Sequence, residues 1–274
     1  MMFGVCKLTG QRGKFVKSHI LPRALSDRNF ERVGRIQGGQ GERPSIRYTS
    51  WYDQELVTEE GEAKLSQIDN DGISELARLG LCWRYFPITV DAKRTPIGES
   101  DFEVIEIEDA NVNALRLFFL SILWRAVASR RPEFRDIKLD VNSKRKLGKI
   151  INGEIGPHVS DFPATLVALI TKGEPHTQTP VRVQLPISRH SEGARLDEKI
   201  YRLFLDGLVV HIGRKSLDGK RANAWGRMVV GSDKTLFLLG RPYDGSRQKE
   251  TLDTLRDDLE RTWPDECERI YRAL

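Results

Sequence analysis

The sequence predicts an α+β protein in which a small N-terminal module precedes a larger domain of helices and a mainly antiparallel sheet. Three observations support this prediction. The first 50 residues mix short apolar runs with turn residues, the middle of the chain has apolar residues at helical spacing, and residues 162–240 alternate apolar and polar side chains. We place the module at residues 1–85, a connecting strand or linker at 86–109 and the α+β domain at 110–274.

Two helical segments and one strand are expected in the first part of the chain. Residues 51–81 have apolar residues at helical spacing, and Asn70–Gly72 is expected to break this segment into two helices. Residues 102–108 alternate apolar and acidic side chains, which predicts a half-buried strand after a turn at 96–100. The Gly-rich stretch Gln37–Ser45 is expected to be a loop.

Two more helices are expected after the strand. Asp109 is the candidate N-cap of a helix that runs to about Arg130 and is ended by Pro132. Residues 143–154 form a basic helical segment, with Ser143 as its candidate cap. The apolar run at 115–128 lies within the first of these helices. Two arginines interrupt it and it is too short to cross a bilayer, so we expect a buried helix and no membrane association.

The second half of the chain is expected to form the sheet. Asp206-Gly207 lies between two apolar runs, which predicts a tight hairpin. An amphipathic helix is expected at 250–263. The strand candidates are residues 164–171, 181–188, 201–213, 226–231 and 234–240.

Composition and cysteine usage indicate a globular, cytoplasmic protein. The chain has 274 residues, of which 39% are hydrophobic and 30% charged, and it has no long low-complexity tract. The N-terminal residues lack the apolar core of a signal peptide. Its three cysteines are odd in number and widely separated, so no disulfide framework is expected.

Positive charge is concentrated at the N-terminus. Residues 1–50 contain ten Lys and Arg but three acids, a net charge of +7, whereas the whole chain carries +5. Such a concentration favours a polyanionic partner, most simply nucleic acid. A solvated basic face without a partner is the alternative. The candidate phosphate contacts are Arg12, Lys14, Lys17 and Arg23.

One stretch in this basic segment is a candidate for chemistry. Residues 5–26 read VCKLTGQRGKFVKSHILPRALS, and His19 lies between a basic approach and Pro22. The pattern C-x-x-T-G followed by SHILP resembles the opening of HNH, or ββα-metal, endonucleases, and more closely members of the C-x-x-C…SHIIP type. The resemblance covers about residues 4–70, and a weaker likeness extends to the S-x-x-W-R pattern at Ser121–Arg125.

The resemblance implies a zinc layer that this chain has lost. In such proteins two Cys pairs pin the module around zinc, and here those positions fall on Cys6, Thr9, Thr58 and Gly61. A structural zinc site needs four nitrogen or sulfur ligands, so we predict that structural zinc is absent. Cys6 is then expected to be a small buried hydrophobe. Packing is expected to replace the metal, through Trp51, Tyr52, Leu56 and Leu65.

The resemblance also implies a catalytic layer. His19 falls on the general base, and Asp53 falls on the position of an Asn that orients it. Glu62 falls on the last metal-binding position, so Asp53 and Glu62 are the candidate ligands of Mg²⁺ or Mn²⁺. Ser18 is a poor replacement for the usual metal-binding neighbour of the His. Structural roles for these residues remain open: a buried His19, a helix-capping Asp53 and a solvated Glu62 at a helix start.

Two functions follow from these features. The first is a metal-dependent HNH-type nuclease, with DNA as the expected substrate and RNA as the alternative. The resemblance implies a mobile-element or bacterial defence setting. The second is a catalytically inactive protein that keeps the scaffold and binds nucleic acid or assembles with other molecules. In either case the C-terminal domain is a candidate surface for a partner protein.

Overall fold

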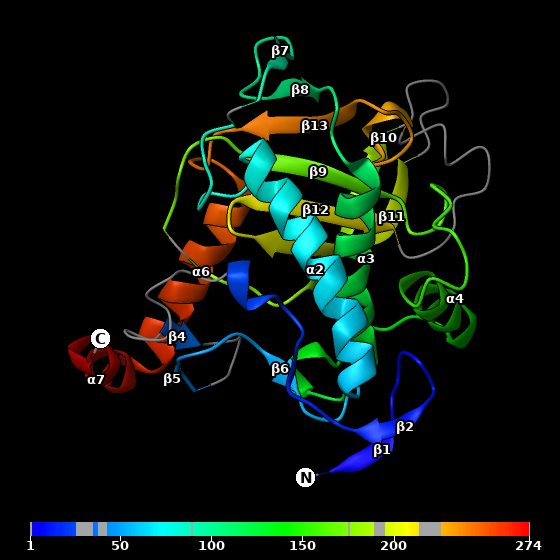
Figure 1. The fold of residues 1–274 in the computed structure, drawn as a ribbon. Helices are drawn as coiled ribbons and strands as arrows, with labels where there is room; N and C mark the ends of the chain where they lie inside the picture. Colours follow the sequence, from blue (N-terminus) through cyan, green and yellow to red (C-terminus); the bar gives the residue numbers. More distant parts are fainter. Residues whose placement is uncertain are drawn as a thin grey trace.

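A seven-stranded sheet forms the centre of the molecule, with the strand order β10-β11-β12-β9-β13-β8-β7 (Figure 1). Neighbouring strands are antiparallel except β9 and β13, which run parallel. With its helices, this sheet confirms the predicted α+β class. The computed structural model describes residues 2–25, 35–37, 43–88, 90–174, 176–188, 195–213 and 226–273.

The regular elements have the following bounds. The strands outside the large sheet are β1 (Phe3–Val5), β2 (Arg12–Lys14), β3 (Ser18–His19), β4 (Arg35–Gln37), β5 (Ser45–Arg47) and β6 (Tyr52–Asp53). The sheet strands are β7 (Ala92–Pro96), β8 (Glu103–Ile107), β9 (Ala164–Leu169), β10 (Val181–Ser188), β11 (Arg195–Leu205), β12 (Leu208–Gly213) and β13 (Leu236–Arg241). The helices are α2 (Glu59–Leu79), α3 (Val112–Ala128), α4 (Val141–Ile151), α6 (Arg247–Thr262) and α7 (Pro264–Ala273).

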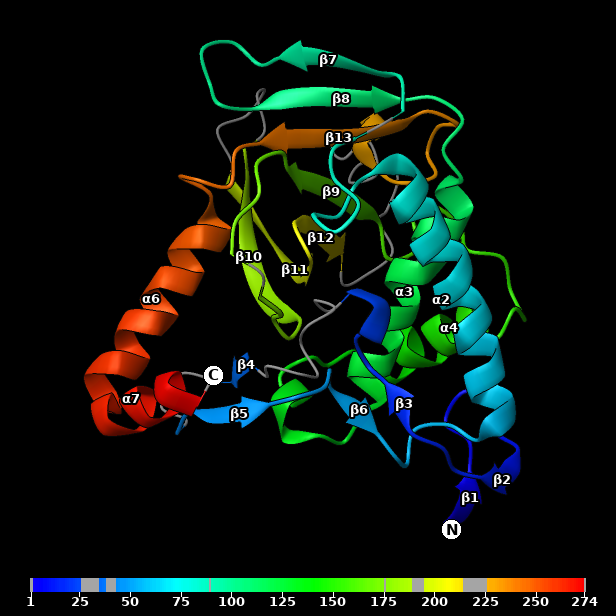
Figure 2. The same cartoon turned by 60° about the vertical axis from the view of Figure 1, so that its left-hand side comes forward.

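Helices α2 and α3 lie side by side across one face of the sheet (Figures 1 and 2). The expected break at Asn70–Gly72 is wrong, because α2 continues through it. Gly72 is buried against α3, and a Cβ there would lie 2.4 Å from the Cβ of Phe118. The glycine therefore permits close helix packing and does not interrupt the helix.

The predicted helix starts need correction. The cap of α3 is Asn111, whose side chain accepts a hydrogen bond from Ala114 N, whereas Asp109 has a left-handed φ of 55°. The cap of α4 is Asp140, which accepts from the backbone N–H and the hydroxyl of Ser143. The caps are thus Asn111 in place of Asp109 and Asp140 in place of Ser143. Asn, Asp and Ser are all favourable N-cap residues, so residue type alone does not select among them.

Four of the five strand candidates form strands β9, β10, β11–β12 and β13. The predicted hairpin at Asp206-Gly207 is confirmed, with φ values of 49° and 92° that a primed turn requires. Residues 226–231 form a 3-10 turn instead of a strand. Most of the Gly-rich loop expected at Gln37–Ser45 lies outside the described residues.

The sheet buries different side chains on its two faces. Leu166, Leu203 and Val210 point toward α2 and α3 and belong to a cluster that extends from Cys6 to Leu238. A second, small cluster covers the other face, where Trp83 packs with Leu169, Phe204, Val209 and Tyr243. The N-terminal strands and the sheet thus share one core, and the proposed division at residues 85 and 110 stays a prediction. Among the described residues, no helix is long and apolar enough to cross a membrane.

Candidate functional site

The candidate base His19 lies on β3, which forms a two-residue antiparallel ladder with β6. Ser18 pairs with Asp53, and His19 pairs with Tyr52. Side chains directly opposite each other share a face, and successive residues alternate faces. His19 is therefore on the face of Tyr52, and Asp53 is on the face of Ser18. His19 and Asp53 are therefore close along the ladder, but their side chains lie on opposite faces of it.

Arg125 holds this ladder against the two long helices. It is buried on α3 and makes a bidentate ion pair with Asp69 on α2, with one N–O distance of 3.0 Å. Its Nη1 also donates to the backbone carbonyl of His19 at 2.9 Å, and its Nη2 donates to Ser121 Oγ at 3.0 Å. One guanidinium thus fixes β3, α2 and α3 relative to one another.

Asp53 is a buried structural connector. Its Oδ1 accepts from Glu55 N at 2.8 Å, and its Oδ2 accepts from Ser129 Oγ at 2.8 Å and from Arg130 N at 3.4 Å. Burial raises the pKa of Asp53, but these hydrogen bonds and nearby Lys7 outweigh it and lower the pKa overall. Oδ2 joins β6 to the residues that follow α3, and Oδ1 accepts from the local backbone, so both oxygens of Asp53 already have hydrogen-bond donors.

Glu62 is a half-buried carboxylate in the first turn of α2. Its Oε2 is buried without a hydrogen-bond partner in the part of the chain that the structure describes. Burial raises its pKa above the usual value, and the Ser18 hydroxyl and Arg125 oppose this shift without reversing it. Among the candidate metal ligands, Glu62 therefore has the carboxylate oxygen that makes no completed hydrogen bond.

We expect Glu62→Gln to stabilise the folded protein at neutral pH. Folding raises the pKa of Glu62, so the ionised form is less favourable in the folded state than in the unfolded state. The folded protein therefore loses stability as the pH rises through the folded-state pKa. The advantage of the Gln variant should vanish below about pH 4, where Glu is protonated in both states. Urea unfolding from pH 4 to 8 measures this, with exposed Glu60→Gln as the matched control in the same turn. A Gln variant less stable than wild type at pH 7 would contradict the prediction.

The four positions at which the resemblance would place zinc ligands meet around one sulfur. Cys6 Sγ accepts from Thr9 N at 3.4 Å, and a Cβ at Gly61 would lie 2.6 Å from this sulfur. Burial raises the pKa of the Cys6 thiol, but hydrogen bonds from Thr9 and from the Thr58 backbone outweigh this and lower it. Cys6 is 1% exposed, as expected of a buried small side chain. One thiol and two Thr do not fit a tetrahedral zinc site.

Of the residues expected to replace zinc by packing, Trp51, Leu56 and Leu65 are buried and belong to the same core cluster as Cys6. Tyr52 is instead half-buried and belongs to the polar surface described below.

The catalytic layer fits a divalent ion only in part. The described ranges contain no group of three or more His, Cys, Asp or Glu side chains that would hold a metal. Mg²⁺ often keeps several waters and uses one or two carboxylates together with substrate phosphates. Glu62 suits that role because of its unused oxygen, whereas Asp53 does not.

A cluster of cations and rings surrounds Tyr52. Lys17 Nζ lies 4.1 Å from the centre of the Tyr52 ring, and Arg131 Cζ lies 5.9 Å from it. The His19 ring meets the same ring edge-on at 6.0 Å. We call these four residues, Lys17, His19, Tyr52 and Arg131, the Tyr52 cluster. It combines an aromatic ring with two positively charged side chains, Lys17 and Arg131.

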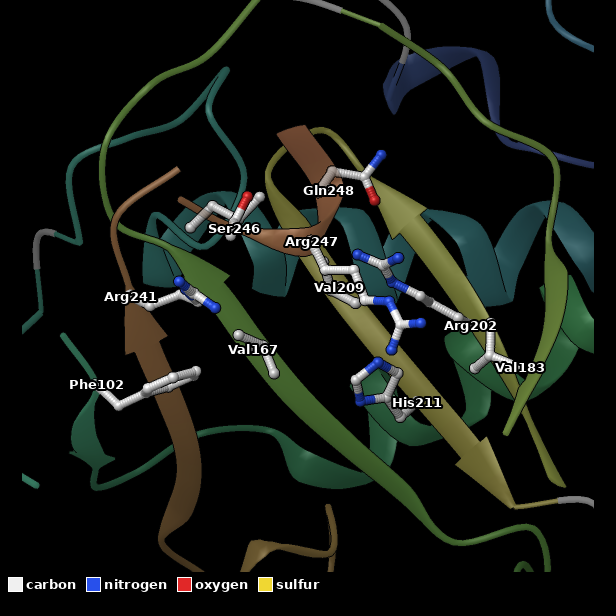
Figure 3. Close-up of a pocket in the computed structure, with 11 residues that line it drawn as sticks. Phe102, Val167, Val183, Arg202, Val209, His211, Arg241, Ser246, Arg247 and Gln248 are labelled. Carbon is white, nitrogen blue, oxygen red and sulfur yellow. The ribbon is translucent and has the colours of Figure 1, made fainter. Parts of the chain in front are cut away.

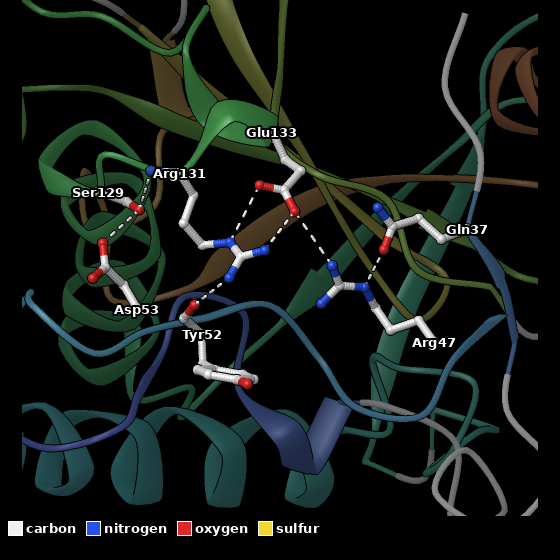
Figure 4. A network of polar contacts seen from close by, with 7 residues as sticks. All are labelled: Gln37, Arg47, Tyr52, Asp53, Ser129, Arg131 and Glu133. Carbon is white, nitrogen blue, oxygen red and sulfur yellow. Dashed lines mark hydrogen bonds and ion pairs between the residues drawn. The ribbon is translucent and has the colours of Figure 1, made fainter. Parts of the chain in front are cut away.

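A polar network anchors this cluster to a distant part of the chain (Figure 4). Arg131 Nη1 donates to the Tyr52 carbonyl at 3.1 Å and pairs with Glu133 at 2.6 Å. Arg47 also donates to Glu133, at 3.3 Å. The hydrogen bond to Glu133 raises the pKa of Arg131. Burial alone would raise the pKa of Glu133, but the bond and charge of Arg131 and the charge of Arg47 outweigh burial and lower it. Segment 129–135 thereby joins β5 and β6.

The predicted phosphate contacts lie in different settings. Arg12, Lys17 and Arg23 are exposed. Lys14 is ion-paired with Glu59 at 3.0 Å, which offsets its charge. Their roles as nucleic-acid contacts stay predictions, and Lys17 is the one within the Tyr52 cluster.

Two residues of the site were not predicted. Arg125 belongs to the S-x-x-W-R pattern, which resembles a feature of the family, but the pattern does not indicate which elements the arginine joins. Arg131 lies in a basic stretch 79 positions from Tyr52, so only the fold brings them together. Comparison with family models, curated proteins and solved structures finds no match for this chain.

Proposed function

We propose that this protein binds nucleic acid through its N-terminal segment, with the Tyr52 cluster at the centre of the contact. The observation that carries the proposal is the Tyr52 ring, flanked by Lys17 and Arg131 within the most cationic part of the chain. Bases stack on aromatic rings, and lysines and arginines neutralise phosphates without reading sequence. The flexible Lys17 side chain can move from the ring to a phosphate, which would free the ring for a base.

The arrangement around Cys6 supports the same proposal. The positions that the resemblance equates with zinc ligands lie around Cys6, and Arg125 holds the strand of His19. The lack of zinc donors at three of these positions is what we would expect of an inactive, nucleic-acid-binding chain of this type. Binding by the C-terminal domain to a partner protein remains a prediction.

Fluorescence anisotropy with duplex DNA, single-stranded DNA and RNA over a range of salt concentrations tests the proposal. We expect Lys17→Ala to weaken duplex binding and to reduce the slope of log K against log[salt] by about 1. Tyr52→Ala should weaken single-strand binding by about tenfold or more, because a stacked base contributes about 1–3 kcal/mol. Lys93→Ala, on β7 at the far edge of the sheet, is the matched control. Equal effects of Lys17→Ala and Lys93→Ala would contradict the proposal.

Metal-dependent cleavage is the second candidate function. The buried Oε2 of Glu62 favours it, since a carboxylate oxygen that makes no completed hydrogen bond suits a cation, although the nearby Ser18 hydroxyl competes with that cation. In the resembling family the ion stabilises charge on the scissile phosphate, and Glu62 would hold it here. His19 would accept a proton from water.

A cleavage assay distinguishes the two functions. Plasmid, single-stranded DNA and RNA are incubated with Mg²⁺, Mn²⁺ or EDTA, using wild type, His19→Ala and Glu62→Gln. Cleavage that requires a metal and is lost in both variants supports the nuclease. Binding without cleavage in any metal excludes the nuclease and leaves the binding function.

A further inference from the structure

The sheet face away from α2 and α3 carries a pocket at the start of α6. The pocket has a volume of about 140 Å³ and opens between strands β9 to β12 and the first residues of α6 (Figure 3). Val167, Val183 and Val209 form an apolar wall. This volume suits a small ligand or the end of a larger one, since drug-sized ligands occupy about 300 Å³ or more.

Two guanidinium groups and an imidazole converge in this pocket. Arg202 on β11 is directly opposite His211 on β12, and Arg247 reaches the same place from α6 (Figure 3). Arg202 is 9% exposed, and its Nε is buried without a hydrogen-bond partner among the described residues. Burial and, to a smaller extent, the charge of Arg247 together lower the pKa of Arg202 to about 10. The buried guanidinium of Arg202 and the exposed one of Arg247 therefore repel each other.

The described residues that line the pocket include no acidic side chain. Burial, together with the charges of Arg202 and Arg247, lowers the pKa of His211 to about 4, so the imidazole is neutral at pH 7. Arg241, which also lines the pocket, already pairs with Asp101 at 2.7 Å. An unpaired buried charge costs several kcal/mol unless an anion accompanies it. Arg202 therefore carries a buried charge without an anionic partner among the described residues, and exposed Arg247 adds a second positive charge at the mouth of the pocket.

The start of α6 adds donors to the same pocket. Ser246 caps this helix of 16 residues, and Arg247 and Gln248 are its first positions. Backbone N–H groups in a first helical turn lack partners within the helix and attract anions. Gln248 is 2% exposed and is held by hydrogen bonds from its Nε2 to His176 and Gln178. The donors are therefore held in place before any ligand binds.

We propose that this pocket binds a small phosphomonoester, with the phosphate against Arg202, Arg247 and the start of α6. A dianionic phosphate matches the buried guanidinium of Arg202 and the exposed one of Arg247, and its three terminal oxygens accept hydrogen bonds from donors on separate elements. A carboxylate carries a single charge and two oxygens, so it matches the pocket less well. The group attached to the phosphate lies on the wall formed by Val167, Val183 and Val209. This site does not depend on nucleic-acid binding by the Tyr52 cluster.

Calorimetric titration of the full chain tests the site. The probes are phenyl phosphate, benzoate, adenosine monophosphate, and a short oligonucleotide with either a 5′-phosphate or a 5′-hydroxyl. We expect phenyl phosphate to bind saturably and at least tenfold more tightly than benzoate. Tight binding of adenosine monophosphate identifies a free ligand, whereas a preference confined to the 5′-phosphorylated oligonucleotide identifies a polymer end. Either result supports recognition of a phosphomonoester.

Variants separate the pocket from the rest of the surface. Arg247→Ala, at an exposed position, should weaken phenyl phosphate binding at least tenfold. Arg202→Met should abolish binding while the unliganded protein remains folded, because Met fills the site without a charge. Arg261→Ala, in the last turn of α6, is the control and should bind as wild type does. Equal affinity for benzoate, absence of binding, or unchanged binding in both pocket variants would overturn the proposal.

Discussion

Replacing Arg125 with alanine is expected to lower the free energy of unfolding by about 3 kcal/mol, the lower end of the range for breaking a buried ion pair. The lower end applies because the side chain of Asp69 is 19% exposed, whereas that of Arg125 is 2% exposed. The substitution also removes the donor to the His19 carbonyl. It therefore loosens the strand that carries the candidate base as well as the contact between α2 and α3.

Urea unfolding of four variants, Arg125→Ala, Asp69→Ala, their double variant and a control, measures this effect. The matched control is Arg130→Ala, an exposed arginine five positions away, which should change stability by less than about 0.5 kcal/mol. In the double variant Arg125→Ala/Asp69→Ala, the loss should be smaller than the sum of the two single losses, because no unpaired carboxylate remains. If Arg125→Ala costs as little as the control, Arg125 does not hold the elements together.

Replacing Trp83 with alanine is the second large effect, with an expected loss of about 3–5 kcal/mol. Trp83 follows α2 and packs on the far face of the sheet, 5.1 Å from the Tyr243 ring centre and 5.8 Å from that of Phe204. Its Nε1 donates to the Leu169 carbonyl at 3.0 Å. A Cβ at Gly207 would lie 2.4 Å from the indole, so the hairpin turn is shaped to receive this ring.

Trp83→Phe provides the comparison, because it keeps an aromatic ring and loses the Nε1 hydrogen bond. We expect it to cost less than the alanine variant by about 1–2 kcal/mol. Tryptophan fluorescence and circular dichroism during denaturation measure both variants. Equal losses in the two variants would show that packing of the ring contributes little.

Sequence patterns over a few neighbouring residues correctly predicted the strands and turns that depend on those same residues. Alternation placed β8, and the Asp206-Gly207 turn placed the β11–β12 hairpin, since each depends on neighbouring residues. The predictions failed where tertiary contacts decided. Gly72 indicates a helix break by propensity, yet the close approach of Phe118 makes glycine necessary at that position.

The candidate site shows the same limit. The motif around His19 drew attention to Glu62 and Lys17, which have an unused oxygen and an aromatic neighbour, respectively. It also suggested Asp53 as a catalytic or metal-binding residue, and the structure engages both of its oxygens in bonds to Glu55, Ser129 and Arg130. Ser129 is 76 positions away, so no local pattern carries that information.

The position of β13 has a consequence for synthesis of the chain. Among the described residues it is the last strand to be made, yet it lies between β9 and β8 and alone links the β7–β8 hairpin to the other four strands. Until residue 241 has left the ribosome, β8 and β9 each present an unpaired edge, which is prone to pairing with other chains. We therefore expect the nascent chain to complete its sheet late and to depend on protection from aggregation until then.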